Sequence, residues 1–503
     1  MNSIQTIKLM KRTIFLPVLM LVTMLFTACD EKFTEMNTDP LRLSELPDEY
    51  LFTTAVRLAI NDLHTEIDSR FGCQYAHIYV HNTEFRSADA YQDFHSTDIY
   101  KEMYKNMYTG PLRYINKVVN MTSYGETRNP VRNAIARVLS VMEYSRVTDC
   151  WGDIPYFDGA RGMEGIMYPK YDRQELIYHD MMDQLKSAVE ILKTANPADG
   201  FVGADPIYNN DLNKWRRFAN SMRLRLAMRA RFVDPAGSAA VITECMKEPF
   251  IETNDENFGL KFQVSDNGAL YNPWYETRKR QNWKMSDKFV EWLKSSNDPR
   301  LKTFVDTTTT GEYKGFMNGL NEQEQSQYLW SNFSNPKPAL YAKDMPINFM
   351  CASEVWFLRA EAALYNLAGG DPQLLYQEGI RKNMMLWNVP LAEITEYLFT
   401  EPEATLSDSE ENKFRQISTQ MWIAFTPNFV EAWSSIRRTG YPVIAQRTDP
   451  DIYNLGVTNG ILPKRFKYSS HEYLTNNENL QVAIKNQGPD KIDTPVWWDV
   501  RGK

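Results

Sequence analysis

Apolar residues recur at helical spacing along much of the chain, and this pattern predicts a mainly helical protein. The clearest stripe places five residues on one face of a helix: Val131, Ile135, Val138, Leu139 and Met142. A second stripe runs over 177–192 and follows Asp172 and Glu175, which we expect to form a capping box. Asn196-Pro197 should end this helix, because the residue before a proline disfavours helical backbone.

A third helix is predicted over 213–232, and it carries five arginines beside its apolar face. They are Arg216, Arg217, Arg223, Arg225 and Arg229. Such a cluster suggests either a phosphate site or a solvated face that bridges neighbouring helices. We favour the second interpretation, because acidic residues are plentiful nearby, and we expect the arginines to lie largely away from the apolar face.

Further helices are predicted over 49–69, 99–122, 353–367 and 372–387, the last two as a hairpin that turns at Gly369-Gly370. Strand alternation is scarce, whereas Pro, Gly, Asn and Asp crowd the intervals 195–211, 233–285, 296–350 and 437–500. We therefore predict an all-α fold of tetratricopeptide-like helical hairpins with long ordered loops. Functional residues are expected in those loops.

The first residues have the pattern of a secretory signal. Lys8, Lys11 and Arg12 precede an apolar stretch over 13–26, which is too short to span a membrane as a helix. The sequence Leu-Phe-Thr-Ala-Cys that ends at Cys29 resembles a lipobox, so Cys29 is predicted to be lipidated after cleavage. An ordinary signal peptide cut nearby is the alternative.

This pattern divides the chain into a signal peptide over 1–28, a lipidated tether over 29–48 and a single domain over 49–503. Asp30, Glu31 and Lys32 follow Cys29, and such an acidic cluster resembles a signal that sends some lipoproteins to the cell surface. The predicted location is the outer membrane, facing the exterior through a lipid anchor.

Composition narrows the function classes. Of the 503 residues 43% are hydrophobic, which is enough to bury a sizeable core. The net charge is -8 and the basic residues are dispersed, so no nucleic-acid partner is expected. Four cysteines besides Cys29 lie outside any C-x-x-C pair, and we expect small core residues rather than disulfides. They are Cys73, Cys150, Cys245 and Cys351.

Catalytic and metal sites find little support. Asp149 and Asp153 suggest a glycosidase carboxylate pair, but Gly152 and Pro155 predict a turn in which the aspartate bonds its own backbone. No catalytic residue is predicted.

His77 and His81, followed by Glu84, would align imidazoles for a metal on a helix, but we favour surface histidines at chance spacing. No metal site or other cofactor is predicted, and the acidic loop from Asp205 to Asp211 gives only weak grounds for calcium.

One segment points to a family. Residues 147–156 read VTDCWGDIPY and closely resemble the TD-x-(aromatic)-GDIPY signature of SusD/RagB-type nutrient-binding outer-membrane lipoproteins. Further blocks resemble that family in the same order, and they lie at 37–40 (NTDP), 169–172, 205–208, 214–229, 298–300, 353–362, 420–424, 437–442 (RRTGYP) and 497–499. The resemblance covers nearly the whole chain.

The resemblance implies a helical protein that performs no chemistry. Such proteins act as the surface lid of a SusC-like TonB-dependent transporter, to which they deliver oligosaccharides or, in some members, peptides. An oligosaccharide is the expected ligand, and peptide is the alternative. Less favoured are a secreted glycoside hydrolase and a helical scaffold for partner proteins.

Sugar sites need flat aromatic platforms beside polar side chains, because a sugar ring has an apolar face and a rim of hydroxyls. The interval 266–285 has that composition, and it supplies six candidates: Tyr271, Trp274, Tyr275, Arg278, Asn282 and Trp283. Tyr91 is a seventh, in a stretch with Asp89, Asp93 and Phe94. The alternative is that these aromatics pack the loops or touch the transporter, a role also suggested for Trp330, Phe333 and Tyr341.

Overall fold

The computed structural model describes residues 46–60, 67–81, 86–93, 98–262, 271–280 and 282–501. The signal, Cys29, the NTDP block, Glu84 and Phe94 lie outside the described residues. Contacts divide the chain into a unit Met1–Tyr50, described only from residue 46, and a compact unit Leu51–Lys503. Among the described residues, no helix combines the length and apolarity needed to cross a bilayer.

Most of the described chain is helical, as predicted. The longer helices are α3 (Asp48–Ile60), α7 (Asp98–Thr109), α8 (Pro111–Ser123), α9 (Pro130–Trp151), α10 (Gln174–Lys193), α11 (Leu212–Ala230), α12 (Pro235–Cys245), α13 (Pro273–Arg280), α14 (Asp287–Ser295), α17 (Ala352–Leu364), α18 (Pro372–Leu386), α19 (Leu391–Thr400), α20 (Glu410–Ala424), α21 (Phe429–Thr439) and α23 (Asn477–Gln487). Short helices are α5 (Cys73–Tyr75), α6 (Arg86–Asp89), α15 (Leu301–Phe304), α16 (Glu322–Ser326) and α22 (Ser470–Thr475), and a π-helical turn spans Asp68–Gly72.

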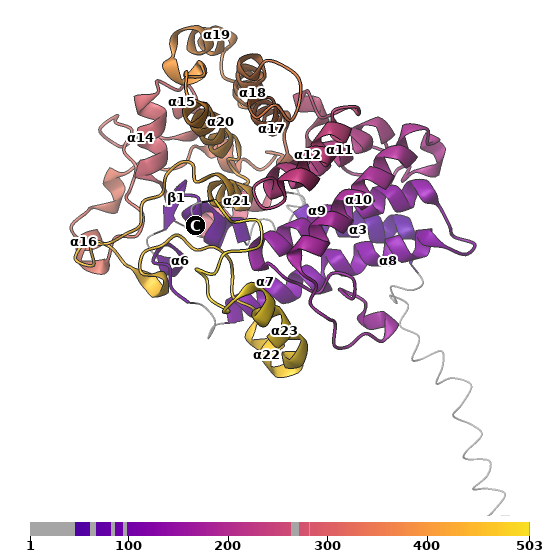
Figure 1. The fold of residues 1–503 in the computed structure, drawn as a ribbon. Coiled ribbons are helices and arrows are strands. Elements are labelled where there is room, and N and C mark those ends of the chain that lie inside the picture. Colours follow the sequence, from indigo (N-terminus) through magenta and orange to yellow (C-terminus); the bar gives the residue numbers. More distant parts are fainter. Residues whose placement is uncertain are drawn as a thin grey trace, which may run out of the picture. The chain divides into compact units, whose positions relative to one another are not determined.

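Helices α8 to α12 pack in chain order, each against the next (Figure 1). Side chains at their starts explain where they begin: Asn129 Oδ1 accepts hydrogen bonds from the N–H groups of Val131 and Arg132, both at 3.0 Å. Asp211 does the same for α11. Such caps satisfy amides that have no partner within the helix. This consecutive packing matches the predicted helical hairpins.

Helices α17, α18 and α20 form a second group (Figure 1). The predicted hairpin of α17 and α18 is confirmed. Gly370, with φ +116°, makes its turn and Asp371 caps α18. A Cβ at Gly379 would lie 2.6 Å from the Phe357 ring, so only glycine allows the two helices to approach this closely.

The predicted helix over 99–122 is instead two helices, α7 and α8, which meet at Gly110 and Pro111. Proline has no amide hydrogen, and its ring clashes with a preceding helical turn. Gly110 therefore leaves the helical region, with φ −93° and ψ −115°, and Pro111 takes the first position of α8, where a missing N–H costs nothing.

The predicted capping box before α10 is wrong. Arg173 occupies the capping position, and no side chain caps the helix. Asp172 Oδ2 instead accepts hydrogen bonds from the N–H groups of Tyr156 at 3.0 Å and Phe157 at 2.9 Å. Asp172 therefore fixes the connection that follows α9.

Three arginines of α11 are buried, contrary to the prediction that they lie away from the apolar face: Arg223, Arg225 and Arg229. Arg225 Nε and Nη2 donate to Glu354 at 2.5 and 2.6 Å, which joins α11 to α17. Arg229 pairs with Asp149 of α9 and with Glu431 of α21. The predicted bridging of helices is thus confirmed, and it occurs inside the core, where a charge needs a partner.

The loop-rich intervals contain two small antiparallel sheets. In one, β1 (Tyr79–His81) pairs with β3 (Trp283–Met285), with Val80 opposite Lys284. In the other, β2 (Phe258–Leu260) pairs with β4 (Ile347–Met350), with Phe258 opposite Met350. The first pairing joins the interval around 283 to β1, and the second holds the segment before α17.

The four cysteines of the described chain are free thiols. Cys73, Cys150 and Cys245 are buried and Cys351 is half-buried. This agrees with the expectation of small core residues rather than disulfides.

Candidate functional site

The predicted aromatic segment folds as α13 followed by β3. Asn272 explains the start of α13, because its Oδ1 accepts the N–H of Trp274 at 2.9 Å. Its Nδ2 donates to the carbonyl of Met345 at 2.8 Å, and its N–H donates to the carbonyl of Lys343 at 2.8 Å. The segment is therefore fixed to the chain around residues 343–345.

Trp274 and Trp283 are core residues, each only 1% exposed. Their rings meet edge to face at 5.5 Å, Trp274 packs on Phe429 and Trp283 stacks on Tyr79. This corrects the expectation of sugar platforms, since neither ring offers a face to a ligand. The reason is that β3 pairs with β1, which places Trp283 against Tyr79 and against Trp274 of α13.

Tyr91 is likewise 1% exposed. The Arg447 guanidinium lies 3.8 Å from the centre of its ring, and its hydroxyl lies 3.1 Å from His77 Nε2. Burial raises the pKa of Tyr91 to about 12. Tyr91 therefore packs a loop, which was the alternative interpretation. Asp89 nearby is buried and pairs with Arg447, whereas Asp93 pairs with Lys467 near the surface.

The other four predicted residues remain accessible. Tyr271, Tyr275 and Arg278 are half-buried and Asn282 is exposed. Lys343 Nζ lies 4.5 Å from the ring centre of Tyr271 and 5.0 Å from that of Tyr275. We call Tyr271, Tyr275, Arg278 and Lys343 the tyrosine patch, which combines aromatic rings with hydrogen-bond donors.

The aromatic residues suggested for a transporter contact differ in exposure. Phe333 is 7% exposed in a cluster with Val80 and Phe316, so it belongs to the core. Trp330 and Tyr341 are half-buried. Only these two retain surface for a partner.

The candidate carboxylate pair serves the fold. Asp149 lies in the last turn of α9, not in a turn after it, and accepts from Trp498 Nε1 at 2.9 Å. Asp153 Oδ1 accepts the N–H of Gln174 at 2.9 Å, and burial raises its pKa to about 6. The predicted bond of Asp153 to its own turn is therefore replaced by one to the start of α10.

The two histidines are not on a helix. His81 lies buried in β1, with Nε2 3.0 Å from the Ser69 carbonyl, so the expectation of a surface histidine is wrong for it. Asp205, in the loop considered for calcium, accepts from Ile207, Tyr208 and Asn210 N–H groups. Within the described parts of the chain, no three acidic, histidine or cysteine side chains group as a metal site would need.

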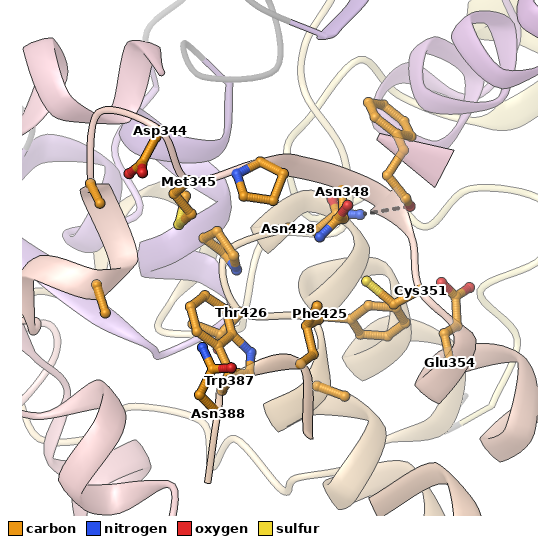
Figure 2. Close-up of a pocket in the computed structure, with 17 residues that line it drawn as sticks. Asp344, Met345, Asn348, Cys351, Glu354, Trp387, Asn388, Phe425, Thr426 and Asn428 are labelled. Carbon is orange, nitrogen blue, oxygen red and sulfur yellow. Dashed lines mark hydrogen bonds between the residues drawn. The ribbon is translucent and has the colours of Figure 1, made fainter. Parts of the chain in front are cut away.

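Sequence reasoning missed a pocket of about 330 Å³ (Figure 2). It lies where three distant segments meet: 339–354, 386–388 after α18, and 424–428 between α20 and α21. Figure 2 shows Trp387, Asn388 and Thr426 grouped together, while Asp344 and Met345 come from the segment facing them. The local signal was aromatic residues beside Asn and Pro at helix ends, in Trp387-Asn388 and Phe425-Thr426-Pro427-Asn428.

The charged residues that line this pocket are Asp344, which is exposed, and Glu354, which is buried and paired with Arg225. No Lys, Arg or His is among the 17 lining residues. Asn428 Nδ2 donates to the Phe349 carbonyl at 3.1 Å. The Met345 carbonyl bound by Asn272 belongs to a lining residue, so the pocket and the tyrosine patch share the segment 343–345.

Comparison with known proteins finds a matching family model and similar solved structures. Residues 40–469 match the family model SusD-like_2, described as "Starch-binding associating with outer membrane". The fold is similar to that of a solved chitin-binding protein, at 26% identity and TM-score 0.79 over 90% of this chain and 100% of that one. A search among curated proteins found no match.

Two further solved structures are similar. A chitin-binding SusD homolog from Flavobacterium johnsoniae has 26% identity and TM-score 0.78, over 90% of this chain and 99% of that one. A SusD homolog from Bacteroides uniformis has 26% identity and TM-score 0.73, over 92% and 100% of the respective chains.

Proposed function

Since this chain belongs to the SusD-like family of non-catalytic, outer-membrane-associated glycan-binding proteins, we propose that it binds a nutrient oligosaccharide at the cell surface and delivers it to a SusC-like TonB-dependent transporter. The observation that carries the proposal is the family match over residues 40–469. A peptide ligand is the alternative within the same role.

The proposal includes the location of the protein. Residues 1–28 act as the signal, Cys29 carries the lipid, 29–48 form the tether and 49–503 form the binding domain. A lipid-modified cysteine holds a protein at a membrane without a spanning helix. Cys29→Ser should move the protein from the outer-membrane fraction to the soluble fraction, and mass spectrometry of the N-terminal peptide should detect acyl chains only in the wild type.

The ligand class is an oligosaccharide, and chitin fragments are the first to test because two structural relatives at 26% identity are named chitin-binding. Such a ligand presents apolar ring faces and hydroxyls. The half-buried rings of Tyr271 and Tyr275, with Arg278 and Asn282, supply surfaces of both kinds. Tyr91, Trp274 and Trp283 are left out of the proposed contact because they are buried.

Isothermal titration calorimetry of the chain starting at Asp30 tests the proposal, with chitin, starch and other oligosaccharides and peptides of matched length. The double change Tyr271→Ala and Tyr275→Ala should weaken binding at least about tenfold, equivalent to about 1.4 kcal/mol. Phe399→Ala is the control, since this ring is 84% exposed on α19. Cleaved oligosaccharide would contradict the proposal and favour a hydrolase.

The transporter partner needs a separate test. Affinity purification of the lipidated protein from membranes should recover a TonB-dependent barrel protein. Its loss on changing Trp330 and Tyr341 to alanine, with glycan binding intact, would assign these half-buried aromatics to the transporter contact. Recovery of no barrel protein would contradict the delivery role.

A further inference from the structure

A smaller pocket, of about 170 Å³, lies at the end of the β1–β3 pair that is away from the tyrosine patch. We call it the His77 pocket. Its lining residues come from five segments that are distant in the sequence: His77, 287–288, 317–318, 444–447 and Tyr453. All of them except Asn318 and Arg447 are half-buried or exposed, so a ligand in the pocket has access to their side chains.

The two buried lining residues hold the walls of the His77 pocket together. Asn318 Nδ2 donates to Asp89 Oδ1 at 2.9 Å, and Asn318 Oδ1 accepts from Ser286 Oγ at 2.6 Å. Arg447 Nη2 donates to the same Asp89 oxygen at 3.2 Å. A buried hydrogen-bond network of this kind is rigid when its members are paired. The segments that line the pocket are therefore held in one arrangement before any ligand arrives.

Three lining side chains each hold their position through one polar atom and leave a second polar atom unused. His77 Nε2 lies 3.1 Å from the Tyr91 hydroxyl, and its Nδ1 has no hydrogen-bond partner within the described chain. Asp287 Oδ1 accepts the N–H of Lys288 at 2.7 Å, whereas Oδ2 is unpaired among the described residues. Gln446, which is exposed, donates from Nε2 to a backbone carbonyl at 2.9 Å and keeps Oε1 unused there. Neither His77 Nδ1 nor Asp287 Oδ2 is shielded from solvent, so both are open to a ligand.

The backbone that presents His77 is strained. His77 has φ +53° and Tyr91, its hydrogen-bond partner, has φ +52°, in the left-handed region that residues other than glycine rarely adopt. Such strain lowers stability and persists where the surrounding structure enforces it, most often at binding sites. Here the Arg447 guanidinium, 3.8 Å from the centre of the Tyr91 ring, holds that ring in place. The fold therefore gives up stability to place His77 at this pocket.

The size and surface of the pocket suit one sugar ring. A water molecule occupies about 30 Å³ in the liquid, so the pocket has the volume of about five waters, too little for a longer chain. Tyr453 and Met317 are half-buried and pack against the core cluster of Val80 and Phe316, so they form a fixed apolar wall. Sugar sites combine such a wall with a few placed polar atoms, because a sugar ring has an apolar face and a rim of hydroxyls.

The charges of the lining favour a neutral sugar. Asp287 and Lys288 have opposite charges, and Arg447 is paired with Asp89. His77 is uncharged at neutral pH, because its burial, together with the cations Arg447 and Lys288, holds its pKa well below the usual value. A neutral imidazole offers one donor and one acceptor, which suits hydroxyl groups.

We infer that the His77 pocket is a second glycan subsite, which holds one ring of a neutral sugar. The sugar hydroxyls pair with His77 Nδ1, Asp287 Oδ2 and Gln446 Oε1, and the ring lies against Tyr453. This inference rests on the proposed function, since it takes a glycan to be the ligand. The subsite is distinct from the tyrosine patch, but β3 connects them: Arg278 precedes β3 and Asp287 follows it, so the two sites lie at most about 30 Å apart along the chain.

Saturation-transfer NMR titrations of the chain starting at Asp30 test the inference with three neutral disaccharides: N,N′-diacetylchitobiose, maltose and cellobiose. At least one of them should bind. His77→Asn and Gln446→Ala should each raise its dissociation constant about three- to tenfold, because each removes one hydrogen bond to the ligand. Asparagine tolerates the left-handed backbone of residue 77, and Gln446 is exposed, so both variants should fold.

The matched control is Gln481→Ala. Gln481 is also exposed and also uses only Nε2, which donates to Asn477 Oδ1 at 3.1 Å on α23. This change should leave the dissociation constant unchanged. An equal loss of affinity in Gln481→Ala and Gln446→Ala would overturn the inference, because the effect would not belong to the pocket.

The outcomes separate this subsite from the proposed function. Disaccharide binding that weakens in the pocket variants but not in the Tyr271→Ala and Tyr275→Ala double variant supports the subsite. Binding that depends on the tyrosines alone, or equally on both sets of residues, overturns a separate subsite and leaves the proposed function standing. The same holds if chitohexaose or maltohexaose binds while no disaccharide does. Binding of neither disaccharides nor hexasaccharides overturns both.

Discussion

Asp149 is the residue of the 147–156 segment whose replacement should most affect stability. It is 3% exposed at the end of α9, and its carboxylate pairs with Arg229 of α11. The same carboxylate accepts hydrogen bonds from Tyr178 of α10 and from Trp498 near the C-terminus. One side chain therefore holds three helices and the C-terminal segment together. We consider the change Asp149→Asn, which keeps the volume and removes the charge.

The magnitude follows from these contacts. Removing one member of a buried ion pair costs about 3–5 kcal/mol, because the remaining charge has no partner. Here Arg229 keeps Glu431 as a counter-ion, and the asparagine Oδ1 still accepts the hydrogen bonds from Tyr178 and Trp498, while its NH2 group faces the Arg229 guanidinium in place of the lost carboxylate oxygen. We therefore expect a loss of about 2–4 kcal/mol in the free energy of unfolding.

Urea denaturation of the chain starting at Asp30, followed by circular dichroism, measures this loss. Asp183→Asn is the matched control: it makes the same change at an exposed position of α10 and should shift stability by less than about 0.5 kcal/mol. Glycan affinity of folded Asp149→Asn protein should equal that of the wild type, because Asp149 does not line the pocket or the tyrosine patch. A stability change below about 1 kcal/mol would refute the assignment of Asp149 as a structural hub.

Three further predictions concern buried groups. Burial raises the pKa of Glu143 from 4.5 to about 8, so its folded state keeps a proton that the unfolded state releases. Stability should therefore fall as pH rises from about 4.5 to 8, by up to about 1.4 kcal/mol per pH unit, and Glu143→Gln should flatten this slope in urea titrations. Gly152→Ala should lower the free energy of unfolding by more than about 1 kcal/mol, because φ is +85° and the new Cβ would meet Gln487. Gly125→Ala is the control for backbone strain alone, because Gly125 also has a positive φ, +75°, but has open space around its Cβ position. Urea denaturation of both variants separates the cost of strain from the cost of the clash. Trp283→Ala should cost about 3–5 kcal/mol in urea melts, and glycan affinity measured on the protein that remains folded should not change.

Much of the fold was predictable because its determinants are local. The helical stripe at 131–142, the Gly369-Gly370 turn and the NTDP-to-RRTGYP order of blocks are all legible in short windows of sequence. The all-α class, the α17–α18 hairpin and the family followed from these. The two errors were also local. Pro111 begins a new helix instead of lying inside one, and Asp172 accepts hydrogen bonds from the connection after α9 instead of capping α10.

The site was less predictable. Aromatic residues among Asn, Pro and Gly have the same local pattern whether their rings pack inward or face solvent. Pairing of β3 with β1 buried Trp283, and Phe429, more than 140 residues away, covered Trp274. Tyr271, which precedes α13, and Tyr275, in its first turn, stay half-buried beside Lys343.

The sequence by itself determined the helices, the family and the composition of the binding loops. Only the tertiary structure decided which of those side chains a ligand can reach, and it alone produced the pocket at Thr426 and Trp387. Backbone preference depends on neighbours within a few residues, whereas exposure depends on contacts between segments such as 339–354 and 424–428 that meet only after folding.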